Sequence, residues 1–130
     1  MPHLTLEYSD NLPEPLDHRA LFASLHAVLE RLGSFSPSQM KSRAVPQALY
    51  YTGTGAPDNI FVHLTVAVLN GRDPALWQQI SAELLVILQS AFARAWIERP
   101  CDLTVEIREM RREWYSKTTN ELVSATTAFP

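Results

Sequence analysis

The chain has 130 residues, of which 46% are hydrophobic and 19% are charged, and its formal net charge at pH 7 is −3. This composition excludes an intrinsically disordered chain and predicts one domain over residues 1–130 with a buried core. The lack of a basic run argues against a nucleic-acid partner, and the lack of a leader or a long apolar run argues against a membrane partner and favours a cytoplasmic location.

Cysteine and histidine usage gives no sign of a metal or cofactor site. Cys101 is the only cysteine, which fits a reduced compartment and a structural role. The four histidines show no metal-ligand spacing, and the sequence has neither a glycine-rich phosphate loop nor a Gly-x-Ser-x-Gly elbow. We therefore expect an activity without a metal or an organic cofactor.

The start of the chain, Met-Pro-His-Leu-Thr-Leu-Glu-Tyr-Ser, predicts a β-strand. Leu4, Leu6 and Tyr8 alternate with polar residues, as in a strand with one buried face. Removal of Met1 would give Pro2 a free secondary amine that is held at the end of a sheet. Alternatively, Pro2 is only tolerated at the start of a strand, where its missing N–H is not needed.

An amphipathic helix is predicted over residues 17–32, after a proline-rich turn. Its apolar stripe consists of Leu21, Phe22, Leu25, Val28, Leu29 and Leu32. Gly33 suits the C′ position just after a helix. His26 flanks the stripe, so we interpret it as a residue of the helix surface and not as a ligand.

The next extended segment covers residues 40–51, and Pro46 predicts a bend or an edge position within it. Lys41 and Arg43 are two residues apart, so they share one face of this strand. By themselves, these two cations are better explained by a solvated strand face than by a ligand site. The glycine-rich run at residues 52–59 then predicts a turn.

Residues 60–69 form the most strongly predicted strand. Nearly all of them are apolar, which is typical of a strand that is covered on both faces. His63 and Thr65 are the polar members. A histidine in such a strand is more often a satisfied interior residue than a catalyst.

A second helix is predicted from Asp73 to just before Pro100. Asp73 suits the N-cap, and Pro74 suits the first helical position. Arg72 stands directly before this start, where the helix dipole favours anions and not cations. Arg72 is therefore either merely solvated or placed for a ligand, and an anion bound there would also meet the N–H groups of the helix.

The last strand is predicted over residues 103–108, where apolar and polar residues alternate. Beyond it, a C-terminal arm of about residues 111–130 carries Trp114, Tyr115 and Phe129 without a clear period. We expect this arm to pack on a neighbouring subunit.

The order of the predicted elements repeats, because strand-helix-strand occurs over about residues 2–51 and again over about residues 60–110. A long connection through a helix favours parallel strands and a right-handed crossover. We therefore predict an α/β (α+β) fold, in which a duplicated β-α-β unit forms a four-stranded sheet with two helices on one face. The other face is expected to be largely apolar, so that an oligomer would cover it.

Four short stretches together resemble the 5-carboxymethyl-2-hydroxymuconate isomerase family of the tautomerase superfamily. They are the start Pro-His-Leu-Thr-Leu-Glu-Tyr-Ser-Asp-Asn, Lys41-Ser42-Arg43, Phe61-Val62-His63-Leu64-Thr65 and Gly71-Arg72. The resemblance covers about residues 2–110. It implies a tautomerase-like fold, a homotrimer, and a cofactor-independent isomerase of aromatic-compound catabolism. The implied substrate is a small di- or tricarboxylate dienol of the 2-hydroxymuconate type.

The resemblance also implies roles for individual residues. Pro2, freed by removal of Met1, would be the acid–base residue that moves the proton. Lys41, Arg43 and Arg72 would hold the carboxylates of the substrate. Lys41 stands where the family pattern has an arginine, and lysine lacks the two-pronged guanidinium. Whether Lys41 or Arg43 makes the main carboxylate contact therefore stays open.

Other functions are compatible with the same residues. The superfamily also contains dehalogenase, hydratase and decarboxylase activities that use the same proline, as well as cytokine-like members, and the fold alone does not choose among them. A ferredoxin-like binding module without catalysis is a further alternative. A retained Met1 would cap Pro2 and favour such a binding role.

Overall fold

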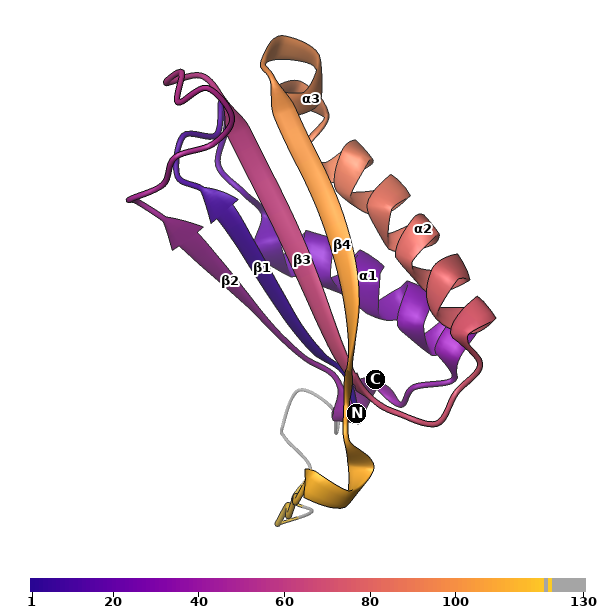
Figure 1. Cartoon of the computed structure of the whole chain (residues 1–130). Helices are drawn as coiled ribbons and strands as arrows, with labels where there is room; N and C mark the ends of the chain where they lie inside the picture. Colours follow the sequence, from indigo (N-terminus) through magenta and orange to yellow (C-terminus); the bar gives the residue numbers. More distant parts are fainter. Residues whose placement is uncertain (121, 123–130) are drawn as a thin grey trace.

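The computed structural model describes residues 1–120 and 122, so Phe129 and most of the end of the C-terminal arm lie outside the described residues. The sheet forms one layer and the helices form a second layer on one of its faces (Figure 1). The elements in chain order are β1 (His3–Ser9), α1 (His18–Gly33), η1 (Pro37–Gln39), β2 (Lys41–Gln47), β3 (Ile60–Leu69), α2 (Pro74–Ala91), α3 (Ala93–Glu98), β4 (Cys101–Met110) and η2 (Arg112–Trp114).

The four strands lie in the order β2-β1-β3-β4. β1 pairs with β2 and β3 pairs with β4 in parallel, whereas β1 and β3 are antiparallel neighbours at the centre. Each parallel pair is joined through a helix, so the sheet consists of two β-α-β units. This arrangement confirms the predicted fold.

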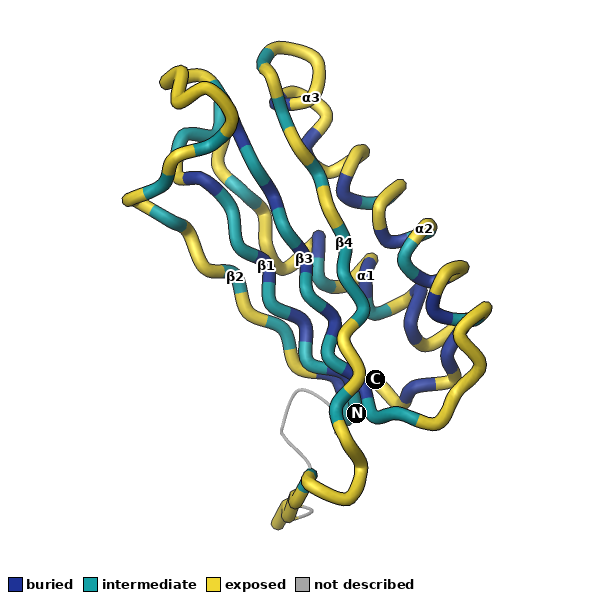
Figure 2. The backbone as a smooth tube through the Cα atoms, in the orientation of Figure 1, coloured by how far each residue is buried: buried dark blue, intermediate teal, exposed yellow. Residues whose placement is uncertain are grey.

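The core lies between the sheet and the helices, and Figure 2 shows the buried positions on the inner sides of both layers. Its fully buried side chains come from β1, β3, α1 and α2: Leu4, Leu6, Leu25, Leu29, Ile60, Val62, Leu64, Val66, Val68, Ile80, Leu84 and Leu88. Burial of each such side chain stabilises the fold by about 1.5–3 kcal/mol. Within residues 1–120 and 122, no helix has the length and apolar character needed to cross a membrane.

α1 ends one residue later than predicted. Asp17 caps its start by accepting a hydrogen bond from the Ala20 N–H at 3.2 Å. At its end, Ser34 adopts the left-handed conformation, with φ 55°, that was expected of Gly33. Gly33 is the last helical residue, and a Cβ on it would lie 2.5 Å from the ring of Phe35. The glycine is thus needed for close packing and not for backbone freedom.

β2 is shorter than the predicted segment of residues 40–51, because it ends at Gln47. β1, its partner in the sheet, ends at Ser9, and a last hydrogen bond joins the Asp10 N–H to the Gln47 carbonyl at 3.0 Å. Pro46 also lacks a backbone N–H, so it cannot donate a hydrogen bond to another strand. β2 therefore ends where β1 no longer offers a pairing partner, before Tyr50 and Tyr51.

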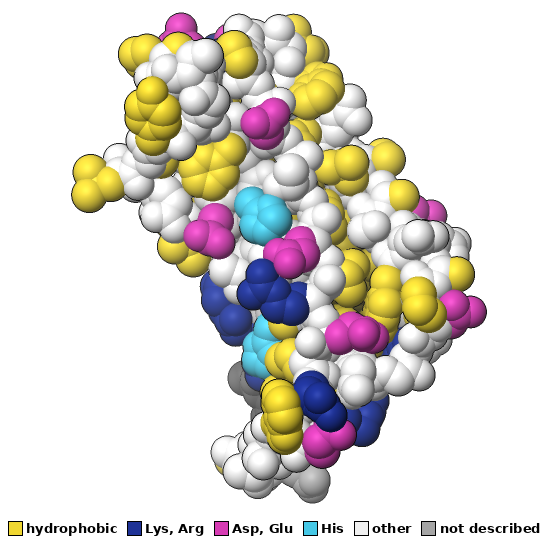
Figure 3. All heavy atoms as spheres, in the orientation of Figure 1, with side chains coloured by type: hydrophobic (Ala, Val, Ile, Leu, Met, Phe, Trp, Pro, Cys, Tyr) yellow, Lys and Arg dark blue, Asp and Glu magenta, His cyan; other side chains and the backbone are white. Residues whose placement is uncertain are grey.

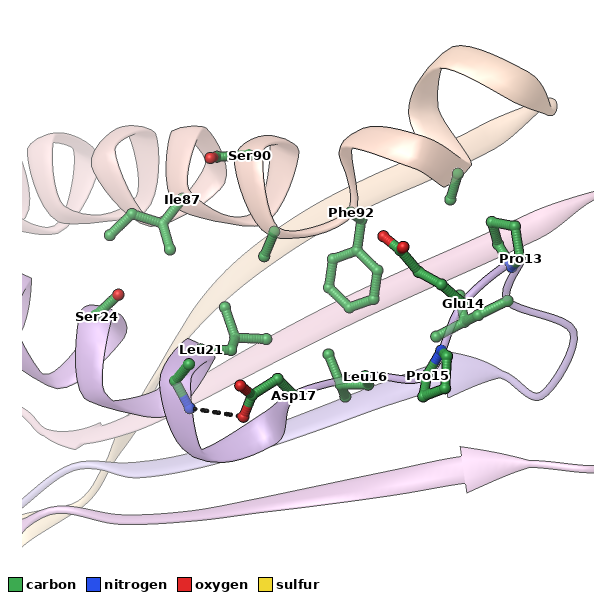
Figure 4. Close-up of a pocket in the computed structure, with 14 residues that line it drawn as sticks. Pro13, Glu14, Pro15, Leu16, Asp17, Leu21, Ser24, Ile87, Ser90 and Phe92 are labelled. Atoms are coloured by element: carbon green, nitrogen blue, oxygen red, sulfur yellow. Dashed lines mark hydrogen bonds between the residues drawn. The ribbon is translucent and has the colours of Figure 1, made fainter.

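The sequence predicted that the second helix continues to just before Pro100, but the structure shows a shorter helix. α2 ends at Ala91, and Phe92, with φ −107° and ψ 32°, separates it from α3. The Phe92 ring is buried and points from this junction toward α1 (Figure 4). β4 in turn is longer than predicted, since it runs over Cys101–Met110.

The sheet face away from the helices is mixed and not largely apolar, so this expectation was wrong. Because side chains alternate along a strand, β3 presents only half of its residues there, namely Phe61, His63, Thr65, Ala67 and Leu69. His63 is satisfied but not interior, since its ring nitrogens lie 2.6 Å from Thr104 Oγ1 and 3.3 Å from Glu106 Oε1. An apolar open face therefore cannot be the reason for an oligomer.

Candidate functional site

The candidate site lies at the end of the sheet where β1 and β2 both begin. Pro2 is buried just before β1, and its carbonyl oxygen accepts a hydrogen bond from the Lys41 N–H at 3.2 Å. The parallel register pairs His3 with Lys41. The pairing of the two strands thus brings Lys41, which is 39 positions away in the sequence, beside the proline.

Positive charge surrounds the N-terminus. The pKa of the Met1 amine is lowered first by burial and then by Arg72, Lys117, Lys41 and Arg112. In Figure 3, basic side chains gather over the part of the sheet face that leads to the end where the N-terminus lies. Both causes disfavour the charged form of an amine at this place.

The cations around the first three residues have no acidic partner in the part of the chain that the structure describes. We call Lys41, Arg43, Arg72, Arg112 and Lys117 the N-terminal cation cluster. Within residues 1–120 and 122, none of the five forms a salt bridge with a carboxylate. Elsewhere in this part of the chain, arginines do pair with acids, as Arg31 does with Glu83 at 2.6 Å. The uncompensated charge makes the cluster a suitable place for an anionic ligand.

Arg72 has a structural role that neither sequence alternative included. Its guanidinium donates to the Gly33 carbonyl, and its Cζ lies 4.2 Å from the centroid of the Phe35 ring. That ring stacks in turn on Trp77. A cation at the C-terminal end of α1 is favoured by the helix dipole. Since a guanidinium has five N–H donors, this contact leaves others for a ligand.

Arg43 contacts the site through His3. Arg43 Nη2 lies 3.3 Å from His3 Nδ1, and His3 Nε2 lies 3.0 Å from the hydroxyl of Tyr115. The pKa of His3 is lowered first by burial and then by Arg43 and Lys41. A neutral His3 ring therefore connects a residue of β2 to a residue of the C-terminal arm.

The apolar cavity of about 390 Å³ shown in Figure 4 lies elsewhere, at the end of the sheet where β1 finishes. Its lining includes the carboxylates Glu14 and Asp17 and no lysine, arginine or histidine. Asp17 is already engaged as the cap of α1. A cavity with this charge is unsuited to a ligand with several carboxylates.

A wider hollow of about 690 Å³ lies between α1 and β2. Inside it, His26 Nε2 lies 2.6 Å from the Ser42 hydroxyl, and burial lowers the pKa of His26. His26 therefore joins the helix to the edge strand, which is more than the surface role expected from the sequence. Pro2 lines neither of the two hollows.

The full chain can now be compared with known proteins. Residues 2–123 match the family model described as 5-carboxymethyl-2-hydroxymuconate isomerase. The chain belongs to the 5-carboxymethyl-2-hydroxymuconate isomerase family. The resemblance inferred from the sequence is thereby confirmed, and so is the isomerase class at the level of the family.

Relatives of this isomerase family agree in sequence and in fold. The chain is 31% identical over 110 residues to the 5-carboxymethyl-2-hydroxymuconate Delta-isomerase of Escherichia coli, with 85% of this chain and 87% of the relative covered. A crystal structure of a 5-carboxymethyl-2-hydroxymuconate isomerase from Deinococcus radiodurans R1 superposes with a TM-score of 0.83 at 32% identity, over 92% and 90% of the two chains. A fused 4-OT symmetric trimer shares the fold, with a TM-score of 0.68 at 13% identity over 89% and 93%.

In this member of the isomerase family, the fold brings all four residues predicted for the site to the region around the N-terminus. Sequence reasoning missed the contribution of the C-terminal arm, which adds Arg112, Tyr115 and Lys117. The only sequence signal for these three was the presence of basic and aromatic residues after the last strand. That signal does not indicate where the arm lies in the fold, because the arm has no periodicity.

Proposed function

We propose that the protein is a cofactor-independent isomerase that converts a carboxylated dienol of the 2-hydroxymuconate type into its conjugated ketone. Pro2, once Met1 has been removed, is the residue that carries the proton. The observation that supports this most directly is a buried proline just before β1, beside a cluster of cations that have no carboxylate partner among residues 1–120 and 122.

The proposed base must be neutral at the working pH. An α-amine in a peptide titrates at about 7.7–8.0, and a proline amine is somewhat more basic. Burial and the nearby cations lower the pKa of the Met1 amine, and the same causes would act on a Pro2 amine one residue further inside. A lowered pKa leaves more of the amine in its neutral form, which suits a group that must both accept and return a proton.

The proposed reaction moves one proton from oxygen to carbon. The Pro2 nitrogen accepts the proton of the enol hydroxyl, and its conjugate acid then protonates a carbon of the conjugated system. Lys41, Arg43 and Arg72 bind the carboxylates, and one of these cations stabilises the negative charge on oxygen while the dienolate exists. No electrons are exchanged with another molecule, so the step needs no redox partner.

We further propose that the enzyme is a cytoplasmic homotrimer of aromatic-compound catabolism. One structural relative is described as a symmetric trimer, which supports this assembly. Light scattering on the purified protein would test the assembly. The expected mass is three times the 14.7 kDa of one chain, and a monomer at micromolar concentration would contradict the proposal.

The decisive experiment compares two forms of the same protein on a 2-hydroxymuconate-type dienol. In the first form Met1 has been removed, and in the second it is retained, which mass spectrometry verifies. An amide nitrogen is not a base, so we expect the Met-capped form to lose nearly all activity. For the processed form, kcat/KM should rise with pH through one group whose pKa lies below that of a free proline amine. Equal rates for the two forms would remove Pro2 from the mechanism.

A further inference from the structure

The first part of the C-terminal arm, residues 111–117, crosses the end of the sheet at which Pro2 lies. Arg112 donates from its backbone N–H to Asn70 Oδ1 at 3.0 Å and from its guanidinium to the Asn70 carbonyl at 3.1 Å. Tyr115 then contacts His3, and Lys117 Nζ donates to Gln39 Oε1 at 2.5 Å. These contacts follow the strand order from β4 past the end of β3 and the start of β1 to the start of β2.

The hydrogen bonds of His3 determine whether the hydroxyl hydrogen of Tyr115 is free to be donated. Arg43 is only a donor, so His3 Nδ1 must accept from it. In a neutral ring the proton is then on Nε2, which donates to the Tyr115 oxygen. The hydroxyl hydrogen of Tyr115 is not used in this contact and can be donated to a ligand. The lowered pKa of His3 keeps the ring in this neutral state.

Lys117, two residues after Tyr115, supplies a positively charged ammonium group on the same arm. It is close enough to the N-terminus to lower the pKa of the Met1 amine, and it forms no salt bridge in the described part of the chain. Lys41 comes from the start of β2 and Arg72 from the turn before α2, so the arm is a third source of donors around Pro2. A hydroxyl donor together with an ammonium group is suited to a carboxylate.

We propose that Tyr115 and Lys117 bind a third carboxylate of the substrate, and that the arm thereby selects a tricarboxylate dienol over a dicarboxylate one. The inference rests on the proposed function. Lys41, Arg43 and Arg72 bind the two carboxylates of the muconate skeleton, and the arm binds the additional carboxymethyl group. Arg43 and His3 also act as positioning residues for Tyr115, because they fix the direction of its hydroxyl hydrogen.

The test uses processed enzyme and two substrates, 5-carboxymethyl-2-hydroxymuconate and 2-hydroxymuconate. Tyr115→Phe and Lys117→Met should each lower kcat/KM for the first substrate by roughly 10- to 100-fold, mainly through KM, because a hydrogen bond to a charged group is lost before the chemical step. For the second substrate, which lacks the third carboxylate, both variants should lose much less, so the ratio of the two kcat/KM values should fall. Tyr51→Phe is the matched control, since the Tyr51 hydroxyl donates to the Thr54 carbonyl in a distant loop.

The outcomes separate the two proposals. Wild-type enzyme that converts neither dienol would contradict the proposed function and, with it, the inference. An active wild type whose arm variants lose both substrates equally, or neither, would contradict the inference alone. Lys117 is exposed, so its variant tests the idea even if Tyr115→Phe weakens the docking of the arm.

Discussion

The two ends of the sheet differ in whether their basic side chains contact carboxylates. Where β1 begins, the N-terminal cation cluster has no salt bridge with a carboxylate in the described residues. Where β1 finishes, Arg94 lies 2.6 Å from Glu98 and 3.9 Å from Glu14, and Arg99 donates to the Asn11 carbonyl at 2.5 Å. At the second end arginines contact carboxylates or a carbonyl, whereas at the first end the cations have no carboxylate partner among the described residues and are available to a ligand.

The same comparison shows why the shape of the surface alone does not find the site. The apolar cavity of Figure 4 lies at the second end, but its two carboxylates would repel a polycarboxylate. At the first end, neither of the two hollows is lined by Pro2. The N-terminal site is therefore recognised by its electrostatics.

Arg72→Ala should have the largest effect of the substitutions that contrast the two ends. Loss of a charged hydrogen bond to substrate should reduce transition-state or ground-state stabilisation by roughly 1.5–3 kcal/mol. The variant should also be less stable, because Arg72 caps α1 through Gly33 and covers Phe35. Steady-state kinetics and urea unfolding measure the two losses separately. Lower stability with wild-type kinetics would restrict Arg72 to its structural role.

Asn11→Ala makes the matching change at the other end. The Asn11 side chain donates to the carbonyls of Pro57 and Asn59, both at 2.9 Å. We expect a loss of about 1 kcal/mol in the free energy of unfolding. Removal of Asn11 Oδ1, which is buried without a partner among the described residues, offsets part of the cost. Activity should not change, and a fall in kcat/KM per folded enzyme would break the contrast between the ends.

The smallest effect expected is a shift in pH dependence in Lys41→Met, which is separate from the loss of carboxylate binding. Lys41 is one cause of the lowered pKa at the N-terminus, so its removal should raise the pKa of a Pro2 amine. Because the neutral amine is the active form, the acidic limb of the kcat/KM profile should move to higher pH. The pH profiles of the wild type and the variant measure this shift. A shift to lower pH, or none, would argue against charge coupling between Lys41 and the base.

The sequence by itself determined the elements and their order. Alternation at the start of the chain and in residues 60–69 fixes two strands, because one side of each must be buried. Asp17 and Asp73 mark the starts of α1 and α2 through local hydrogen bonds to Ala20 and Ala75. These signals act within a few residues, so they can be read without the fold. Pro2 and the candidate cations could likewise be named as site residues from the sequence.

The tertiary structure decided where the elements stop and what meets at Pro2. β2 ends where β1 no longer offers a partner, the second helix breaks to bury Phe92, and Gly33 is needed because of the Phe35 ring. Tyr115 reaches His3 across 112 positions of the sequence. A contact of this span depends on the completed sheet and not on any local pattern, so only the fold could place the arm at the site.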